Sequence, residues 1–425
     1  MSALEEVAPD GLPRLLAGLK PHRQLSLGEH LAQHGPITLG ERRSLFPLLE
    51  ASGLRGRGGA GFPTARKLHA VAAGRGRPIV LVNATEGEPL SDKDKTLLRH
   101  LPHLVLDGAV LLAAELRTRE VVLAIAETAH PERVALQSAL VERRSRHQDG
   151  RVRIEVVTVP DRFVAGEESA LVQYLNGGPA LPTFTPPRPF ERGIGKRPTL
   201  VQNAETVAQV GLIARYGPDW FRQLGTESEP GSALFTLSGA VRRPGVLEAE
   251  LGVPVRELVA RAGGLTQRPR ALLIGGYFGT WFDAADAAAL TLDDACLNER
   301  GGSLGARAVA VIPEGTCGLC ETVQVANYLA QESAGQCGPC VNGLAALAGG
   351  LKRLAERPTG NEAEAIKRWA RQVQGRGACR HPDGAARFVA SAIDVFSVEI
   401  EHHRSRQRCP HPGVRLLHVP AERST

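Results

Sequence analysis

Residues 78–89, PIVLVNATEGEP, decide the fold, because an unbroken apolar run passes directly into a polar loop. Two similar runs follow it, EVVLAIAE at 120–127 and RIEVVTV at 153–159, and the segments 97–116 and 131–144 between them have the composition of helices. Apolar strands without alternation, separated by helices, are typical of a parallel sheet that is covered on both faces. Ligands of such sheets bind beyond the carboxyl ends of the strands, so we expect the loop after Ala84 to border a site.

Outward from this sheet, the 425 residues divide into four expected units, since the chain is too long for one core. Residues 1–50 are expected to form short covering helices and 51–230 an α/β domain. Residues 231–315 read as strand, turn, strand and helix, a small β-grasp-like α+β domain, and 316–425 as a helical bundle. Within the α/β domain, the Gly- and Pro-rich residues 177–198 predict a long irregular loop with a function.

The composition is that of an average globular protein, with 43% hydrophobic and 23% charged residues. Aromatic residues make up only 4% and the net charge of +6 is dispersed, so nothing favours a nucleic-acid partner. The longest apolar stretches, 79–82 and 105–116, are shorter than the roughly 18 residues that a membrane span needs. The first residues are acidic rather than basic, unlike a secretory signal, and we therefore expect a cytoplasmic protein.

Residues 53–67, GLRGRGGAGFPTARK, carry five glycines within nine residues, followed by a lysine. Glycines let backbone N–H groups approach an anion, so the composition suits a phosphate cradle, although the spacing is neither that of a P-loop nor that of a dinucleotide fingerprint. A flexible loop is the alternative. Glu86 and Glu88 follow the first strand and could meet a ligand or simply be solvated. Gly166 to Ser169, GEES, puts two acids at a helix start, where the helix dipole alone would favour them.

All seven cysteines fall after residue 295, which favours a metal or cluster site over a disulfide scaffold. Cys337 and Cys340 form a C-x-x-C pair with Cys379 as a distant third thiol. This spacing suits zinc, a redox disulfide or an iron–sulfur cluster, and the neighbouring proline and helical surroundings favour the cluster. Cys317 and Cys320 form a second pair, but one pair lacks enough ligands, and we interpret these two as structural thiols.

Five segments in this order resemble the NADH-binding flavoprotein subunit of NADH:quinone oxidoreductase, respiratory complex I, and the related β subunits of NAD-linked hydrogenases and formate dehydrogenases. They are GLRGRGGAGFPT, NATEGEP, GEESALVQYLNG, PTLVQNAETVA and ESAGQCGPC. The resemblance runs from about residue 27 to about residue 403. It implies a Rossmann-like FMN domain, an SLBB (soluble-ligand-binding β-grasp) domain near residue 231, and a C-terminal helical bundle that carries a [4Fe-4S] cluster.

The resemblance also implies an activity and a set of residues. NADH would give a hydride to FMN, and electrons would then pass singly to an iron–sulfur centre or to a ferredoxin-like partner protein. The family's motifs assign FMN contacts to the glycine loop, to the first strand and to two later segments, and nicotinamide contacts to one aromatic ring and two carboxylates that we take as catalytic. The FMN residues are Gly56, Gly58, Lys67, Asn83, Glu86, Gly166, Glu167, Gln202 and Asn203; the nicotinamide residues are Phe62, Glu88 and Glu168.

The cluster motif departs from the family's S-C-G-x-C-x-P-C, because its first cysteine is replaced by Ala334. Cys337, Cys340 and Cys379 remain as ligands. The site would therefore hold a [4Fe-4S] cluster with a non-cysteine fourth ligand, a [3Fe-4S] cluster, or nothing. Ser333 and His381 are the candidates for the fourth ligand, with a helix-capping serine and a solvated histidine as the alternatives.

The residues expected to bind the nicotinamide nucleotide also differ from the family's pattern. The family's K-P-P-F-P is Thr185-Pro-Pro-Arg188-Pro here, a second aromatic of the adenine pocket is Ala70, and an acid after the first strand is Thr85. These changes remove stacking partners for NADH, and Arg188 could instead meet the 2′-phosphate of NADPH. Two alternatives follow from the departures: an FMN protein fed by ferredoxin, or a degenerate scaffold or ligand-binding module. The family also implies work beside a small [2Fe-2S] protein, peripheral to a membrane complex.

Overall fold

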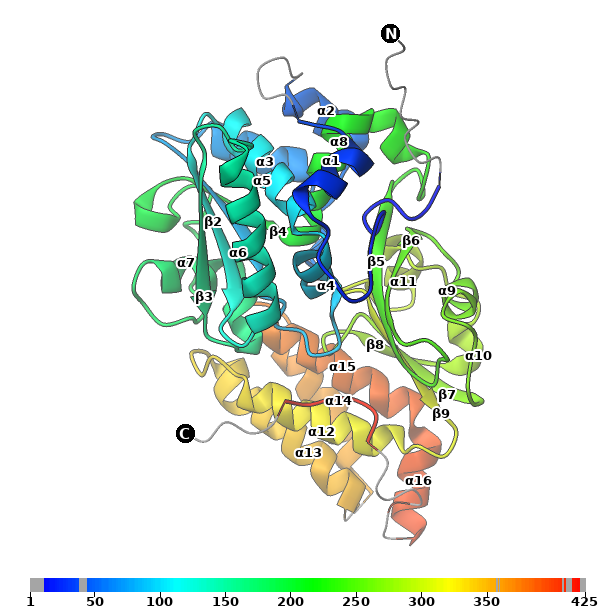
Figure 1. Cartoon of the computed structure of the whole chain (residues 1–425). Coiled ribbons are helices and arrows are strands. Elements are labelled where there is room, and N and C mark those ends of the chain that lie inside the picture. The colour runs from blue at the N-terminus through cyan, green and yellow to red at the C-terminus, as the bar shows by residue number, and fades with distance from the viewer. Residues whose placement is uncertain are drawn as a thin grey trace.

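The computed structural model describes residues 11–37, 44–356, 358, 360–406, 409 and 415–420, and the expected cover at residues 1–10 lies outside these ranges. Figure 1 shows an α/β part, a smaller part built on a second sheet, and a helical bundle that packs below both. Of the expected N-terminal helices, the described ranges contain two, α1 (Leu27–His34) and α2 (Leu45–Ser52). Leu15 and Leu16 are buried in turns rather than in a helix.

The first sheet is parallel throughout, with the strand order β3-β2-β1-β4, as the apolar runs predict. Val80 and Val82 of β1 join the core beneath the long helices α5 and α8, whereas Leu81 joins the core on the opposite face beside α7. The sheet is therefore covered on both faces (Figure 1). Its strands are β1 (Ile79–Ala84), β2 (Glu120–Ala126), β3 (Arg153–Val159) and β4 (Thr199–Asn203).

The helices around this sheet differ from the expectation at one place. The segment 97–116 is not one helix: α4 (Lys93–His100) and α5 (Pro102–Glu115) meet at an angle of 96°. Pro102 is the physical reason, because proline suits the first turn of a new helix and cannot continue an old one. The remaining helices of this part are α3 (Thr64–Ala72), α6 (His130–Ser145), η1 (Phe163–Gly166), α7 (Glu168–Leu175), η2 (Ile194–Lys196) and α8 (Ala204–Arg222).

Helix α5 is almost wholly buried and crosses α8 at very short range. A Cβ atom on Gly108 would lie 1.8 Å from the carbonyl oxygen of Val207, so this crossing requires glycine. Within the described ranges, no single helix is long and apolar enough to cross a membrane, and only the bent α4–α5 pair passes the test of length and composition.

The second sheet has the order β6-β5-β9-β7-β8 and confirms the expected β-grasp-like unit. Its central strands β5 and β9 run parallel, and the outer pairs β5–β6 and β7–β8 are antiparallel. The elements are β5 (Ser232–Gly239), β6 (Gly245–Glu250), α9 (Val255–Arg261), β7 (Pro269–Ile274), β8 (Thr280–Asp283), α10 (Ala284–Ala287), α11 (Asp294–Glu299) and β9 (Ala308–Pro313).

The C-terminal part is the expected helical bundle. Its first helix begins at Gly318, just after β9. It packs against the second sheet, where the ring of Trp281 on β8 lies 5.8 Å from that of Phe388. Its elements are α12 (Gly318–Gln331), the π-helix η3 (Pro339–Leu344), α13 (Ala345–Glu356), α14 (Glu362–Val373), α15 (His381–Val395) and α16 (Ser397–Arg406).

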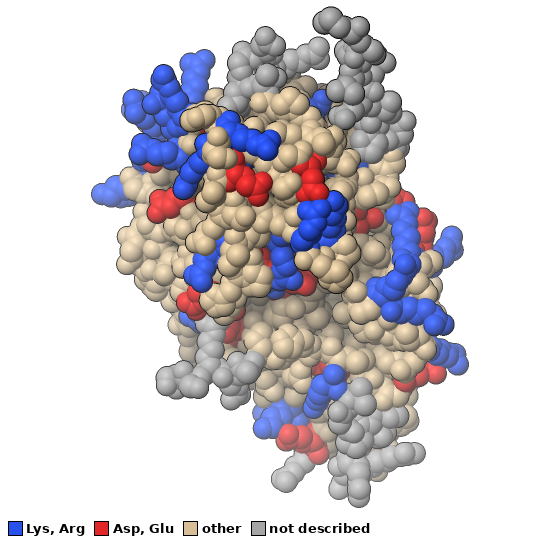
Figure 2. Space-filling view, viewed as in Figure 1, with Lys and Arg blue, Asp and Glu red and all other residues tan. Residues whose placement is uncertain are grey.

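Charged side chains are spread over the visible face of the molecule. Figure 2 shows basic and acidic groups interspersed at many separate points, with uncharged surface between them. This distribution agrees with the dispersed charge in the sequence and gives no continuous basic stripe on this face.

Candidate functional site

A cavity of about 350 Å³ lies at the carboxyl ends of β1 and β4, where the parallel sheet predicts a ligand. All three parts of the fold line it, from the glycine loop and the loop after β1 to the second sheet and the start of α15. Its volume is within the range of small-molecule sites. Among the predicted site residues, the following line the cavity: Gly58, Asn83, Glu86, Glu88, Gly166, Glu167, Asn203 and Cys379. The other predicted site residues lie outside its lining: Gly56, Phe62, Lys67, Glu168, Gln202, Cys337 and Cys340.

The glycine loop is a closed turn rather than a flexible one. The backbone N–H of Gly56 donates to the carbonyl of Phe62 across the loop, at 2.8 Å. A Cβ atom on Gly58 would lie 3.2 Å from Cβ of Asn203, and Gly59 has a φ of +100°. The loop thus brings its backbone against the end of β4, which is what a phosphate or flavin cradle requires.

Gly166 packs against the loop after β1. The side-chain amide of Asn83 donates to the carbonyl of Gly166 at 2.7 Å, and the amide oxygen of Asn83 accepts from the Thr85 hydroxyl at 2.9 Å. A Cβ atom on Gly166 would lie 2.6 Å from Oγ1 of Thr85. Thr85, which replaces an acid of the family, therefore packs directly against Gly166.

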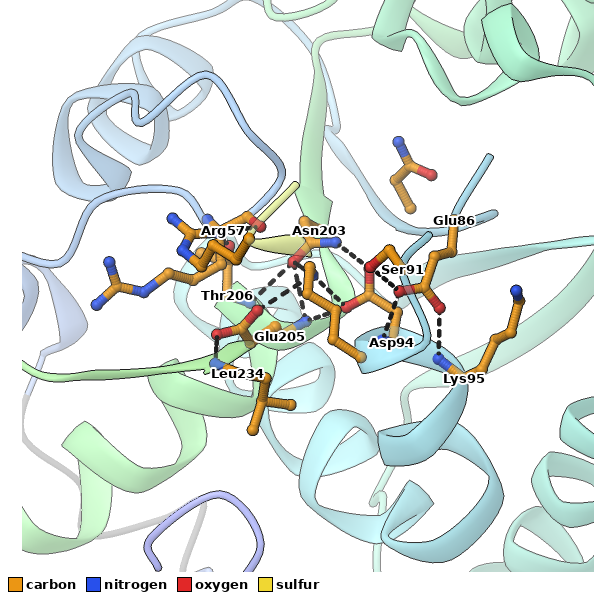
Figure 3. A network of polar contacts seen from close by, with 12 residues as sticks. Arg57, Glu86, Ser91, Asp94, Lys95, Asn203, Glu205, Thr206 and Leu234 are labelled. Atoms are coloured by element: carbon orange, nitrogen blue, oxygen red, sulfur yellow. Dashed lines mark hydrogen bonds and ion pairs between the residues drawn. The ribbon is translucent and has the colours of Figure 1, made fainter. Parts of the chain in front are cut away.

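A buried polar network that was not predicted from the sequence borders the cavity, whose lining includes Lys93, Asp94 and Asn203. Figure 3 shows Asp94, Asn203 and Glu205 of this network. Nζ of Lys93 lies 2.8 Å from Asp94 and 3.1 Å from Glu205, and the amide of Asn203 donates to Asp94 at 2.6 Å. Burial by itself lowers the pKa of Lys93, but the charges of Asp94 and Glu205 raise it overall. The segment SDKDK reads as an ordinary solvated helix start, so no signal in the sequence marks this lysine as buried.

Glu86 lines the cavity, but its carboxylate is hydrogen-bonded to residues at the start of α4. It accepts from the Ser91 hydroxyl at 2.6 Å and from the backbone N–H groups of Asp94 and Lys95 at 3.0 and 2.8 Å (Figure 3). The residue adopts a φ of 43°, a conformation that costs energy outside glycine. Burial, and then the charge of Asp94, raise the pKa of Glu86 to about 7.

Glu88 reaches the second sheet. Its carboxylate accepts from the backbone N–H of Tyr277 at 2.9 Å and from that of Leu90 at 3.2 Å. Burial raises the pKa of Glu88 to about 7. A carboxyl at the cavity wall thus changes its charge near neutral pH, which is a common property of functional groups.

The two acids at the start of α7 have different partners. The carboxylate of Glu167 caps the helix, accepting from the N–H groups of Ser169 and Ala170 at 2.8 and 3.1 Å, and burial raises its pKa. Glu168 instead pairs with Lys67, whose ammonium also donates to the carbonyl of Val201; these contacts measure 2.8 and 3.0 Å. The structure therefore joins the predicted Lys67 and Glu168 in one ion pair.

Gln202 lies on β4 next to the cavity-lining Asn203 but is itself outside the lining. The residue is 5% exposed, and its Nε2 is buried without a hydrogen-bond partner among the described residues. The cavity that fits a flavin nucleotide is formed by the glycine loop and the carboxyl ends of β1 and β4. Phe62 is 48% exposed, as a ring that stacks on a second, exchangeable ligand would be.

The three predicted cluster cysteines lie together beside this cavity. The thiols of Cys337 and Cys340 are hydrogen-bonded to each other, and Cys379 is near both. Burial raises the pKa of Cys379 to about 11. Ser333 donates its hydroxyl, and Ala334 its backbone N–H, to the thiol of Cys340. The backbone of Ala334 thus lies against one of the three thiols.

The two candidates for the fourth ligand are placed differently. The Ser333 hydroxyl already touches Cys340. His381 lines the cavity, and its Nε2 contacts the carbonyl oxygen of Leu329 at 2.8 Å, whereas its Nδ1 is buried without a hydrogen-bond partner in the described chain. Burial lowers the pKa of His381 to about 4, so the imidazole is neutral. His381 is therefore not the solvated residue that the alternative interpretation supposed.

A second group of thiols lies elsewhere in the bundle. The structure brings His403 and Cys409 to the pair Cys317 and Cys320, with the four ligand atoms all within 4.8 Å of one another. The proximity of these four residues was not predicted from the sequence, because the two halves of the group are far apart in the chain. The spacing His-x₅-Cys near the end of the sequence was the available signal.

Comparison with known proteins identifies the class as flavin- and iron–sulfur-dependent oxidoreductase subunits. Residues 49–212 match the family described as the Nuo51 FMN-binding domain, 234–276 the SLBB domain, and 320–403 the NADH-ubiquinone oxidoreductase-F iron-sulfur binding region. These matches confirm the predicted FMN unit, β-grasp unit and iron–sulfur region.

Full-length relatives make the assignment more specific. The F subunit of the Streptomyces coelicolor NADH-quinone oxidoreductase is 32% identical over 378 residues, which cover 86% of this chain and 84% of the relative. NADH dehydrogenase [ubiquinone] flavoprotein 1 of Dictyostelium discoideum is also 32% identical, covering 83% and 77%. The chain belongs to the family of NADH-quinone oxidoreductase F subunits, as the five motifs indicate.

A solved structure supports the same fold. A chain of the NAD⁺-reducing [NiFe]-hydrogenase in the air-oxidized state superposes with a TM-score of 0.79 at 28% identity, covering 92% of this chain and 68% of the hydrogenase chain.

Proposed function

We propose that the protein takes a hydride from NADH at a bound FMN and passes the electrons singly to an iron–sulfur centre. The observation that carries this proposal is the shared cavity, which is lined both by the glycine loop and strand ends of the FMN-binding segment and by Cys379 of the iron–sulfur segment. FMN supplies the conversion, since a flavin accepts two electrons at once and releases them one at a time.

The chain's own residues would bind and orient the flavin. Gly58 and Gly166 line the cavity and would face the flavin with their backbone. Asn83 and Asn203 also line it, and their side chains are hydrogen-bonded to adjoining segments of the chain. We therefore assign the two glycines to direct contact, the two asparagines to positioning, and Gln202 to the strand end behind the lining.

Glu88 at the cavity wall, and Glu168 and Phe62 outside the cavity lining, would serve the nicotinamide nucleotide. Glu88 is held by two backbone N–H groups and exchanges a proton near neutral pH. Glu168 is neutralised by Lys67, so this pair can accept a ribose hydroxyl without adding net charge. The exposed ring of Phe62 would stack on the nucleotide, with a gain of about 0.5–1.5 kcal/mol for an aromatic pair.

At the iron–sulfur site, Cys337, Cys340 and Cys379 would ligate three irons. Both candidates for the fourth position stay open, because the Ser333 hydroxyl lies against Cys340, and His381, whose Nε2 contacts a backbone carbonyl oxygen, keeps the lone pair of Nδ1 for a ligand. We therefore propose a [4Fe-4S] cluster with Ser333 or His381 as the non-cysteine ligand, or a [3Fe-4S] cluster. The alternatives of a ferredoxin-fed flavoprotein and of an inactive scaffold gain no support from the cavity or from the relatives.

The partner would be a small iron–sulfur protein. The curated relatives are named as subunits, which supports a role within an assembly. We also propose the four units 1–50, 51–230, 231–315 and 316–425, and a cytoplasmic location peripheral to a membrane complex.

The test is NADH-dependent reduction of a one-electron acceptor by protein loaded anaerobically with FMN, iron and sulfide. We expect turnover that needs FMN, and a Cys379→Ser variant that still bleaches its flavin with NADH but transfers electrons more slowly to a protein acceptor. Loaded protein that leaves NADH unoxidised would refute the proposal.

A further inference from the structure

The second thiol group, consisting of Cys317, Cys320, His403 and Cys409, takes no part in the function proposed above. Its ligand atoms all lie within 4.8 Å of one another. Cys317 and His403 are almost wholly buried, at 2% and 1% exposed, and the other two are half-buried. Among the described residues, no other group of His, Cys and acidic side chains has this arrangement.

The spacing of these atoms is that of ligands around one ion. Sγ of Cys317 lies 3.4 Å from Nε2 of His403. With zinc–sulfur and zinc–nitrogen bonds of about 2.3 and 2.0 Å, a tetrahedral ion holds its ligand atoms about 3.5–3.8 Å apart. The four atoms therefore need to move little to close on an ion. A four-iron cluster has a metal–sulfide cube between its thiolates and would require a wider separation.

The histidine is already oriented as a metal ligand. Nδ1 of His403 contacts the carbonyl oxygen of Ala355 at 2.5 Å, so Nδ1 carries the proton. In the neutral ring the lone pair is then on Nε2, which faces the thiol of Cys317. A backbone carbonyl on the far ring nitrogen is the usual support for a zinc-bound histidine.

The chemistry of the four ligands indicates which metal binds and whether the site is structural or catalytic. Three thiolates and one imidazole are soft to intermediate donors, which suit zinc rather than magnesium or calcium. Cys-x₂-Cys and His-x₅-Cys are spacings close to those of structural zinc sites, and a complete set of four protein ligands leaves no position for substrate.

We propose that Cys317, Cys320, His403 and Cys409 bind one structural zinc ion. Cys317 follows β9 and precedes α12, Cys320 is in the first turn of α12, His403 is on α16, and Cys409 comes after that helix. The ion fastens the end of the chain to the junction between the second sheet and the bundle. It leaves the electron-transfer route of the iron–sulfur site untouched.

The experiment is elemental analysis of the purified full-length protein after exhaustive dialysis against a chelator. We expect one zinc per chain in the wild type and in Cys296→Ser, a matched control that replaces another half-buried thiol. The double variant Cys320→Ser/His403→Ala should lose the zinc and retain its iron, whereas Cys340→Ser should lose iron and retain its zinc.

X-ray absorption at the zinc edge of the wild-type protein keeps the test independent of variant folding. Three sulfur neighbours and one nitrogen neighbour, at about 2.3 and 2.0 Å, are expected. Wild-type protein without zinc, zinc that survives in the double variant, or a coordination shell of oxygens would each overturn the proposal.

Discussion

Replacing Lys93 by methionine tests how much the buried polar network at the cavity contributes to the stability of the fold. The substitution keeps the volume of the side chain and removes its charge. The ammonium has contacts of 2.8 and 3.1 Å with the carboxylates of Asp94 and Glu205, and the three side chains are at most 4% exposed. Without the lysine, the direct hydrogen bonds left to these two buried carboxylates come from neutral donors, namely the Asn203 amide and two backbone N–H groups.

The expected cost is large because the remaining charges cannot reach water. Removing one partner of a buried ion pair costs about 3–5 kcal/mol, whereas an exposed pair contributes about 0–1 kcal/mol. Lys95 offers the matched control on the same helix, since its side chain is 32% exposed and its ammonium lies 3.5 Å from the carboxylate of Asp92. We expect Lys93→Met to lower the free energy of unfolding by about 3–5 kcal/mol and Lys95→Met by less than about 1 kcal/mol.

The assay is urea denaturation of both variants and the wild type at about pH 5 and about pH 8. The charge of Lys93 lowers the pKa of Glu86, which burial and Asp94 already raise to about 7, so the Lys93→Met substitution raises the folded pKa of Glu86 further above its unfolded value. The folded variant then binds the additional proton, so its deficit is small at low pH and grows as the pH rises through about 7. Equal effects of the two substitutions, or a deficit that shrinks with rising pH, would refute the reasoning.

Three further predictions concern the cavity and the cluster. Gly166→Ala should weaken FMN binding in a fluorescence titration, because its Cβ meets Oγ1 of Thr85 at 2.6 Å; adding Thr85→Ala should restore part of the affinity, and Gly11→Ala, which has open space, should change nothing. The rate of flavin reduction by NADH should change between about pH 6 and 8, as Glu88 loses its proton, and become flat in Glu88→Gln in stopped-flow measurements. Ala334→Cys should make the reconstituted protein retain more iron than the wild type during dialysis against a chelator, because it completes the set of four thiolates; equal retention would contradict an incomplete ligand set.

Much of the fold could be predicted from the sequence, because its signals are local. The apolar runs that contain Val80, Val121 and Val156 all became neighbouring parallel strands. The break between α4 and α5 could also have been predicted, since Pro102 stands near the start of the segment 97–116 that we expected to be one helix. The relation between the two sheets is not local, and no spacing in the chain encodes it.

The residues of the site could be predicted only where they belong to a recognisable sequence motif. The glycine loop and the cysteines around residue 340 have recognisable spacings. Lys93 does not, since a lysine next to an aspartate at a helix start is normally solvated, and only tertiary packing buries it. His403 and Cys409 were missed for a related reason: their partners Cys317 and Cys320 are distant in the chain and come together only in the folded bundle.

The most direct test of the central claim is an anaerobic single-turnover measurement on FMN- and iron-loaded protein mixed with NADH and, separately, with NADPH. We expect rapid loss of the flavin absorbance with NADH, followed by slower bleaching of the iron–sulfur absorbance as electrons leave the flavin. Flavin that stays oxidised with both nucleotides, while an added reduced ferredoxin bleaches it, would contradict hydride transfer from NADH to FMN.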